Sequence, residues 1–447
     1  MERLFHLREL GATVRTELLA GTTTFFTMAY IIFVNPVILS GSGYGDSGAE
    51  FMDFGAVMAA TCIAAALASI FMGLVANYPI ALAPAMGENA VFTSFVAGGL
   101  MTWEMGLAAV LISGIVFFML TFLRVREMMI SSIPDSLKQA IAAGIGVFIA
   151  FLGLVEGGII TKPQGPLAVD LGDPYNPAVW TTMFGLVIAG GLLARKIKGA
   201  ILWTILATTL FALIFKVTRF HGLVDKPPSL EPTFLRFNFQ GLMNVNGLMI
   251  IVIFLFMDVF DSVGTFIGVG QAGGFLKDGK LPRATRALSA DATGTVSGAI
   301  LGTSTVTSYI ESASGVAAGA KSGLANIATG LLFLAALFFY PLVKTVGDAY
   351  LWQGGFYHPI TAPALIAVGC LMMKGVRHVA WDDMSEAIPS LMIILGIALT
   401  YSIADGLAMG LILYPAIKLV AGKGRQVPPL IYILGGLCLA RYVLVHI

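Results

Sequence analysis

The sequence predicts an all-α polytopic membrane protein with fourteen transmembrane segments, arranged as two inverted repeats of seven segments. Of its 447 residues, 57% are hydrophobic and only 11% are charged, whereas soluble domains carry about 25% charged residues. Apolar runs long enough to cross a bilayer recur along the whole chain. The abundant glycines, 52 in number, indicate close packing between such helices.

The predicted segments follow the apolar runs in chain order. The first seven are expected near 17–40, 55–77, 79–98, 105–124, 136–155, 178–195 and 199–216. The second seven are expected near 246–269, 286–301, 303–318, 325–343, 360–374, 387–402 and 406–421. The apolar tail at 429–446 is interrupted by Arg441, which favours an interfacial helix, with a fifteenth span as the alternative.

The basic residues predict the orientation of the chain in the cell (inner) membrane. With a cytoplasmic N-terminus, 19 of the 26 Lys and Arg residues fall on the cytoplasmic side and six on the outer side, and Arg441 lies in the tail. This bias supports an even number of spans with both termini in the cytoplasm. Because each repeat has an odd number of spans, the second repeat is inserted upside down relative to the first.

The third span of each repeat is expected to be interrupted. In Tyr78–Phe95, Pro79 and Pro84 block helix formation in the first part of the segment. In Gly298–Gly315, Gly302 and the hydroxyl-rich run that follows favour extended chain. We therefore predict a short strand followed by a half-helix in both segments. Interrupted helices at matching positions of inverted repeats indicate the binding site of a secondary transporter.

Ionisable and amide side chains gather at these same spans. Asp258 and Asp261 lie three residues apart on one face of the predicted eighth span. A carboxylate in a span costs roughly 2.5–3.5 kcal/mol even on insertion scales, so such acids are functional by default. Glu311 follows the second break, and Asn89 with its neighbour Glu88 follows the first. The alternative for each acid is a structural hydrogen-bonding role near a helix end.

Carboxyl and amide groups of this kind fit a flat heterocycle with N–H and C=O edges. A carboxylate accepts ring N–H bonds, and an amide both donates and accepts. Phe92 follows the first break and offers a ring for stacking, although core or lipid packing is the alternative for most phenylalanines here. Burial favours the neutral form of a carboxyl group, so such a group can take up a proton with the substrate and release it inside.

Other patterns exclude several functions. The chain lacks a basic patch for nucleic acid, its three cysteines are far apart in apolar segments, and its five histidines lack metal-ligand spacing. Motifs for ATP-driven pumping or hydrolysis are absent, so we expect neither a metal nor a cofactor, and not an enzyme. Asp291 is expected to pair with nearby Arg286. Asp382, Asp383 and Glu386 are expected to be solvated.

Stretches along essentially the whole chain resemble the AzgA-like adenine/guanine/hypoxanthine permeases, a family of the nucleobase:cation symporter group with a uracil-permease-like fold. The stretches that carry the resemblance are Thr23–Pro36, Leu82–Phe92, Pro227–Phe234, Asp258–Val269 and Ala290–Gly319. The resemblance implies a core domain of spans 1–4 and 8–11 and a gate domain of spans 5–7 and 12–14. The boundaries are a cytoplasmic N-terminus at 1–16, core 17–124 and 246–343, gate 125–216 and 344–421, an extracytoplasmic loop at 217–245, and a tail at 422–447.

The resemblance also implies that a purine base is held between spans 3, 8 and 10. The residues expected to bind the base are Asn89, Asp258, Glu311, Ser304 and Thr305. Those expected to couple protons are Asp261, Asp258 and Glu311, and secondary roles fall to Glu88, Phe92 and Thr27. Glu88 departs from the family pattern, in which a hydrophobic residue is common at this position.

The sequence therefore predicts import of purine nucleobases (hypoxanthine, guanine or adenine) by proton symport with alternating access. Sodium is the alternative coupling ion, and a homodimer is the alternative to a monomer. An anion transporter of the same fold would also use two half-helix N-termini, but three acids at the site would repel an anion. An intramembrane enzyme would need Asp258 and Asp261 to converge on one substrate atom, which side chains of one helix do poorly. A channel is a further alternative.

Overall fold

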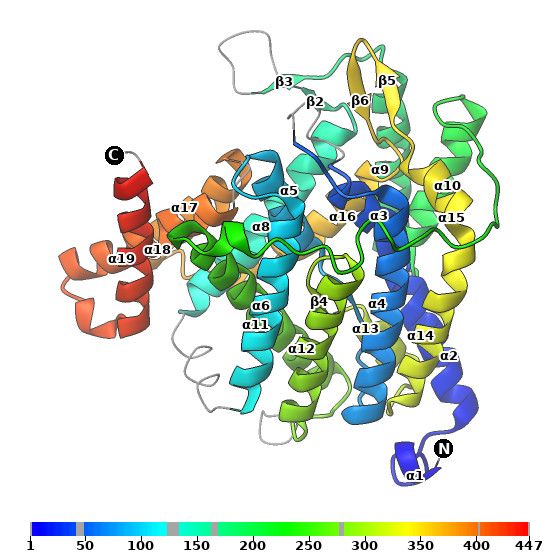
Figure 1. The fold of residues 1–447 in the computed structure, drawn as a ribbon, viewed down its shortest axis with the longest axis horizontal. Coiled ribbons are helices and arrows are strands. Elements are labelled where there is room, and N and C mark those ends of the chain that lie inside the picture. Colours follow the sequence, from blue (N-terminus) through cyan, green and yellow to red (C-terminus); the bar gives the residue numbers. More distant parts are fainter. Residues whose placement is uncertain are drawn as a thin grey trace. The chain divides into compact units, whose positions relative to one another are not determined.

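The computed structural model describes residues 2–41, 49–122, 134–161, 169–276, 281–400 and 403–445. Helices make up most of the described chain, and the few strands are short (Figure 1). The chain divides into two compact units. Unit 1 comprises residues 1–122 and 153–364, and unit 2 comprises residues 123–152 and 365–447.

Unit 1 holds the N-terminal helices, several long helices and all the strands found in the described residues. Its elements are α1 (Glu2–Phe5), α2 (Val14–Met28), α3 (Ile31–Leu39), α4 (Phe54–Val75), β1 (Leu82–Pro84), α5 (Met86–Ala97), α6 (Trp103–Phe122), β2 (Ile160–Thr161), β3 (Asp170–Leu171), α9 (Pro177–Ala194), α10 (Ala200–Ile214), α11 (Val245–Ala272), α12 (Ala284–Leu301), β4 (Val306–Ser308), α13 (Ser312–Ala317), α14 (Leu324–Ala336), α15 (Tyr340–Gly347), β5 (Tyr350–Trp352) and β6 (Gly355–Tyr357). Unit 2 contains α8 (Asp135–Glu156) up to its last turn, most of α16 (Ala362–Met372), α17 (Met384–Thr400), α18 (Ile403–Val420) and α19 (Pro429–Val445).

Within the described residues, seven helical stretches are long and apolar enough to cross a bilayer. They are Val14–Leu39, Phe54–Val75, Trp103–Thr121, Asp135–Glu156, Pro177–Ala194, Asn246–Gly270 and Leu324–Gly347. The mostly helical polytopic membrane fold that the sequence predicts is thereby confirmed, whereas the count of fourteen spans and the inverted repeats stay predictions. The tail forms α19, which packs on α18, and its placement at the interface also stays a prediction.

The strand and half-helix expected in each interrupted segment are both present. β1 is followed by α5, and β4 is followed by α13. The two strands pair with each other in an antiparallel ladder, with Leu82 opposite Ser308 and Pro84 opposite Val306. Bonds on either side of the ladder lengthen it, since the Ala85 amide donates to the carbonyl of Thr305 at 2.9 Å. Backbone freed by the two breaks is thus satisfied inside the protein, as a membrane interior requires.

Side chains of two neighbouring helices hold the first strand in place. The Ser69 hydroxyl of α4 donates to the Leu82 carbonyl at 3.0 Å and accepts from the Leu82 amide at 2.9 Å. The Asn326 amide of α14 donates to the carbonyls of Tyr78 and Ile80 at 3.1 and 2.7 Å. All four side-chain bonds lie in the buried interior, where an unpaired backbone group would be costly. Helices α4 and α14, which pack on each other, therefore fix where β1 begins.

The second break begins at a glycine that its surroundings require. α12 ends at Leu301, and Gly302 adopts a left-handed conformation with φ +91°. A Cβ at this position would lie 2.2 Å from the Cβ of Thr233. The loop carrying Thr233 is held there because the Leu235 amide donates to the Ile300 carbonyl at 3.0 Å. Only glycine combines this φ with so close an approach.

Unit 2 is held together by small residues and by one buried charge cluster. A Cβ at Gly146 of α8 would lie 2.8 Å from the Gly369 carbonyl oxygen, so α8 and α16 cross closely. On α18, Lys418 is only 3% exposed and binds Glu386 at 2.7 Å. The predicted solvation of Glu386 is therefore wrong, because a buried ammonium needs a charged partner. Asp383 is solvent-accessible, and its hydrogen bond with Lys423 lowers its pKa below the usual value.

Candidate functional site

Four residues of unit 1 form a surface that we call the accessible face: Thr27, Asp261, Gly264 and Glu311. Asp261 of α11 is exposed, and Glu311 and Thr27 are partly buried. Glu311 is the main charged neighbour of Asp261. One turn beyond Asp261, a Cβ at Gly264 would meet no atom within 4 Å, so space is open there. Two carboxyl groups thus lie beside an open volume in the part of the chain where the sequence places the binding site.

Glu311 is positioned by α2 and by the junction between α2 and α3. Its Oε1 accepts a hydrogen bond from the Tyr30 hydroxyl at 2.7 Å. The Thr27 hydroxyl lies 2.9 Å from that of Ser314 and 3.4 Å from the Glu311 carbonyl oxygen. Tyr30 occupies the junction between α2 and α3, where the predicted continuous first span is interrupted. The Thr27 hydroxyl also donates to the Thr24 carbonyl at 2.8 Å, and such bonds bend helices.

Asn89 lies behind the accessible face, fully buried, with both ends of its amide engaged. Its nitrogen donates to the Oδ1 of Asn35, and its oxygen accepts from the Ser304 hydroxyl. Asn35 in turn donates to the hydroxyls of Thr61 and Thr303 at 2.6 and 3.0 Å. This network joins α3, α4 and α5 to the chain after the second break. The structure therefore brings Asn89 and Ser304 together, but away from the accessible face. They belong to a set of fully buried polar residues that we call the buried layer: Asn35, Asn89, Asp258, Asp291, Ser304 and Thr305.

Asp258 belongs to the same buried layer and has no exposed surface. Its Oδ2 accepts from the Thr295 hydroxyl at 2.8 Å, and that hydroxyl also lies 3.1 Å from the Val306 carbonyl of β4. Its Oδ1 has no hydrogen-bond partner among the described residues. The hydroxyl of Thr305, directly before β4, is likewise buried and unpartnered in the described part of the chain. Such groups are costly in an apolar interior, and they are free to bind a ligand or a proton.

Asp291 is a member of this layer that the sequence reasoning placed wrongly. It was expected to pair with Arg286, but it is fully buried and its Oδ2 accepts from the Ser262 hydroxyl, whereas Arg286 is exposed. The helix explains the error, because residues five apart on one helix point about 140° away from each other. Ser262 lies 2.9 Å from the Thr307 hydroxyl, which connects Asp291 to β4.

The two remaining candidates differ in character. Glu88, in the first turn of α5, is 2% exposed and its Oε2 has no partner among the described residues. Phe92 is 1% exposed, with its ring 6.3 Å from that of Phe254 and so close to Gly106 that a Cβ there would lie 2.5 Å away. Phe92 is therefore packed in the core in this structure and does not reach the accessible face.

Residues that sequence reasoning missed are Asn35, Tyr30 and Ser262. Asn35 and Tyr30 both lie in the stretch Thr23–Pro36, which the family resemblance already singled out. An asparagine and a tyrosine inside an apolar run were the available signals. Within the described residues, no group of three or more His, Cys, Asp or Glu side chains could hold a metal ion.

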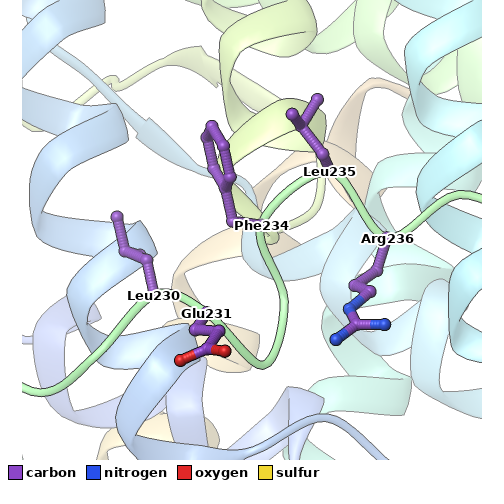
Figure 2. A pocket seen from close by; sticks show the side chains of 5 residues that line it. All are labelled: Leu230, Glu231, Phe234, Leu235 and Arg236. Carbon is purple, nitrogen blue, oxygen red and sulfur yellow. The ribbon is translucent and has the colours of Figure 1, made fainter.

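A surface pocket lies elsewhere, on the long loop before α11 (Figure 2). It is lined by Leu230, Glu231, Phe234, Leu235 and Arg236. Figure 2 shows that one continuous loop carries all five side chains. The loop overlaps the stretch Pro227–Phe234 and packs over the end of α12, so it shapes the second break from outside. It contains none of the predicted binding residues.

Comparisons with known proteins identify relatives along almost the whole length. A family model described as a permease family (Xan_ur_permease) matches residues 15–409. The chain is 46% identical to "Putative permease MJ0326" of Methanocaldococcus jannaschii, over 99% of this chain and 98% of that one. It is 43% identical to the guanine/hypoxanthine permease PbuG of Bacillus subtilis, over 97% of each chain. It is 38% identical to the adenine permease AdeQ of Escherichia coli, over 100% of this chain and 96% of that one.

Solved structures show the same fold at much lower identity. The transmembrane domain of the cyanobacterial bicarbonate transporter BicA matches with a TM-score of 0.59, at 13% identity, over 89% of this chain and 97% of that one. Mouse Slc26a9, an anion transporter in the inward-facing state, matches with a TM-score of 0.57 at 12% identity, over 91% of this chain and 68% of that one. At this identity the likeness concerns the fold and leaves the cargo to be argued from the site.

Proposed function

Because this chain belongs to the permease family that matches residues 15–409, we propose that it imports purine nucleobases by proton symport with alternating access. Family membership makes it a membrane transporter and not an enzyme. Its relatives include permeases named for guanine, hypoxanthine and adenine, and the identity extends over nearly the whole of each chain. These names support a purine as the cargo.

The observation that carries the proposal is the pair of carboxyl groups, Asp261 and Glu311, beside the open space at Gly264. A purine presents ring N–H donors, which carboxylate oxygens accept. In the described part of the chain, neither acid forms an ion pair with a basic side chain. A site with acids and without a facing cation attracts neutral N–H donors and repels anions.

The buried layer supplies the other proposed contacts. We assign Glu311 and Asp258 to ring N–H groups and Asn89, Ser304 and Thr305 to the remaining edge of the base. In the present structure Asn89 and Ser304 bond to each other, so binding requires these residues to exchange partners. Alternating access would provide that exchange, since β1 and β4 carry or flank these residues.

The proposed coupling uses a proton held by Asp258 or Asp261. A buried carboxylate without a cation is strongly destabilised, so a proton neutralises it. The unpartnered Oδ1 of Asp258 is a buried oxygen at which that proton can sit. Asp261 is exposed and can exchange protons with water. In this proposal Asp258 holds the proton during transport, and Asp261 exchanges it with water.

The proposed topology has fourteen spans in the cell (inner) membrane, with both termini in the cytoplasm. Core and gate domains would move against each other. The antiparallel pairing of β1 with β4 supports the inverted arrangement, because two halves inserted in opposite directions present equivalent strands in opposite directions. The bias of Lys and Arg supports the orientation.

Uptake by cells that lack their own purine transporters tests the proposal. Glu311→Gln should lower uptake of radiolabelled hypoxanthine, guanine or adenine by roughly 10- to 100-fold, because a hydrogen bond to a charged group contributes about 1.5–3 kcal/mol. Glu231→Gln, in the exposed loop before α11, is the matched control and should transport normally. A protonophore should abolish accumulation, and removal of sodium should not.

Three results would contradict the proposal. Normal purine uptake by Glu311→Gln would remove Glu311 from the site. Accumulation that requires sodium and resists the protonophore would replace the coupling ion. Uptake of bicarbonate or sulfate in place of purines would favour the anion transporters that share the fold.

A further inference from the structure

Glu88 is a buried acid for which the site described above has no use. It stands in the first turn of α5, directly before Asn89, and is only 2% exposed. Its Oε2 has no hydrogen-bond partner among the described residues. An acid at this position of a helix can accept a hydrogen bond from the backbone amide of the N-cap residue, here Ala85. That amide already donates to the Thr305 carbonyl, so Glu88 is not needed as a cap. Oε2 of Glu88 therefore has neither a structural partner nor contact with solvent.

Among the described residues, every titratable group that faces Glu88 is acidic or neutral. The elements that pack on or lie near α5 are α3, α6, α11, α12 and the segment between β4 and α13. α3 carries no titratable side chain, and α6 carries only one, an acid at its first turn. The facing groups of the other elements are Asp258 and Asp261 on α11, Asp291 on α12, and Tyr309 after β4. No Lys, Arg or His of the described residues is among them.

This arrangement favours a neutral Glu88. Transfer of an ion into a protein interior costs several kcal/mol even after relaxation. The N-terminal end of α5 would return at most about 2 kcal/mol to a negative charge. Asp258 and Asp291 are also fully buried, each with one oxygen unpartnered, so negative charge on several of these groups at once would add repulsion. Protonation neutralises such carboxyl groups, and the unpartnered Oε2 of Glu88 can hold a proton.

We propose that Glu88 is an additional proton-binding site, so that this transporter carries two protons with each purine base. The inference rests on the proposed function, in which one proton is held by the aspartates of α11. When the site faces outward, Oε2 takes a proton from the outer water. When the site faces inward, the same O–H bond breaks and the proton passes to the cytoplasm. Import of one neutral base then moves two positive charges.

The proton number sets how far the base can be accumulated. With the membrane voltage held at zero, each coupled proton multiplies the limiting ratio of inside to outside purine about tenfold per pH unit of gradient. Two protons therefore allow about 100-fold accumulation across one pH unit, and one proton allows about tenfold. Because the limiting ratio is an equilibrium quantity, a variant that transports slowly still reports it.

The experiment uses purified protein in proteoliposomes, with potassium and valinomycin to clamp the voltage. Outside pH is 6.5 and inside pH is 7.5, and radiolabelled hypoxanthine is followed to its plateau. Wild type and the exposed-loop control Glu231→Gln should reach about 100-fold accumulation. Glu88→Gln and Glu88→Leu should reach about tenfold. The amide variant keeps the shape of the side chain and its capacity for hydrogen bonds, but cannot take the proton.

A second measurement keeps the test decisive if both variants transport too little. Proton uptake on hypoxanthine binding is followed with an indicator dye in weakly buffered detergent solution, and Glu88→Gln should take up one proton fewer than wild type. If both variants fail to fold, a wild-type plateau near 100-fold supports the inference and one near tenfold overturns it. If Glu88→Gln and wild type reach equal plateaus, or take up equal numbers of protons, Glu88 is not a proton-binding site, and the proposed function still stands. Failure of wild type to accumulate hypoxanthine under the gradient rejects the proposed function itself.

Discussion

Replacing Asn35 with leucine should destabilise the protein strongly, although the two side chains have similar volumes. Asn35 has no exposed surface and donates to Thr61 and Thr303 at 2.6 and 3.0 Å. It also accepts from the amide nitrogen of Asn89. Leucine makes none of these three hydrogen bonds, so the change removes them without opening a cavity.

The magnitude follows from the groups left behind. The Asn89 amide N–H becomes a buried donor without a partner, which costs about 1–3 kcal/mol, and the two lost hydroxyl bonds are worth about 0.5–1.5 kcal/mol each. Thr61 still donates to the Val57 carbonyl at 2.6 Å, which limits its loss. We expect the free energy of unfolding to fall by about 3 kcal/mol.

Reversible unfolding in mixed detergent micelles measures this change. Asn246→Leu is the matched control, because Asn246 is exposed in the first turn of α11 and its side chain has no hydrogen bond among the described residues, so it should change the free energy of unfolding by less than about 0.5 kcal/mol. A loss below about 0.5 kcal/mol for Asn35→Leu would show that the network contributes little, and would refute the reasoning. Purine binding should weaken as well, because Asn89 loses the partner that orients it.

Three further predictions concern single positions. Gly302→Ala should lower the free energy of unfolding by about 1–3 kcal/mol in the same assay, since φ is +91° and Thr233 blocks a Cβ, whereas Gly191→Ala, with open space around it, should not. Gly264→Val should lower purine uptake while the amount of protein in the membrane stays normal; unchanged uptake would place the substrate elsewhere. Burial lowers the pKa of His358, in the loop before α16, to about 4. Below about pH 6.5 this histidine is protonated in the unfolded chain but stays neutral in the folded protein. The free energy of unfolding of wild type should therefore fall by up to about 3 kcal/mol as the pH falls from 6.5 to 4. His358→Gln should flatten that loss, and parallel stability curves for the two proteins would contradict it.

The interrupted spans could be predicted because their causes are local. Pro79, Pro84 and Gly302 act on the backbone of their own segments, and the strand and half-helix appear where these residues require them. The acids of span 8 could be predicted for a similar reason, since a charged residue in an apolar run stands out in the sequence alone.

Partners across the fold could not be predicted in this way. Asp291 and Arg286 are close in sequence, yet the helix turns them apart and Asp291 meets Ser262, 29 residues away. Asn35 meets Thr303, 268 residues away. Pairings of this kind depend on how α3, α4, α5 and the second break pack together, and neither residue carries a local sign of its partner.

By itself, the sequence determined that this chain is a polytopic membrane protein with two broken spans and acids beside them, because hydropathy, proline and glycine act locally. Only the tertiary structure decided which of those polar groups reach the open space. It places Asp261 and Glu311 on the accessible face, and it buries Asn89, Asp258 and Glu88 behind them. The reason is geometric: exposure depends on what packs against a side chain, and the partners of Asn89 and Asp258 lie on other elements, between 37 and 215 residues away in the sequence.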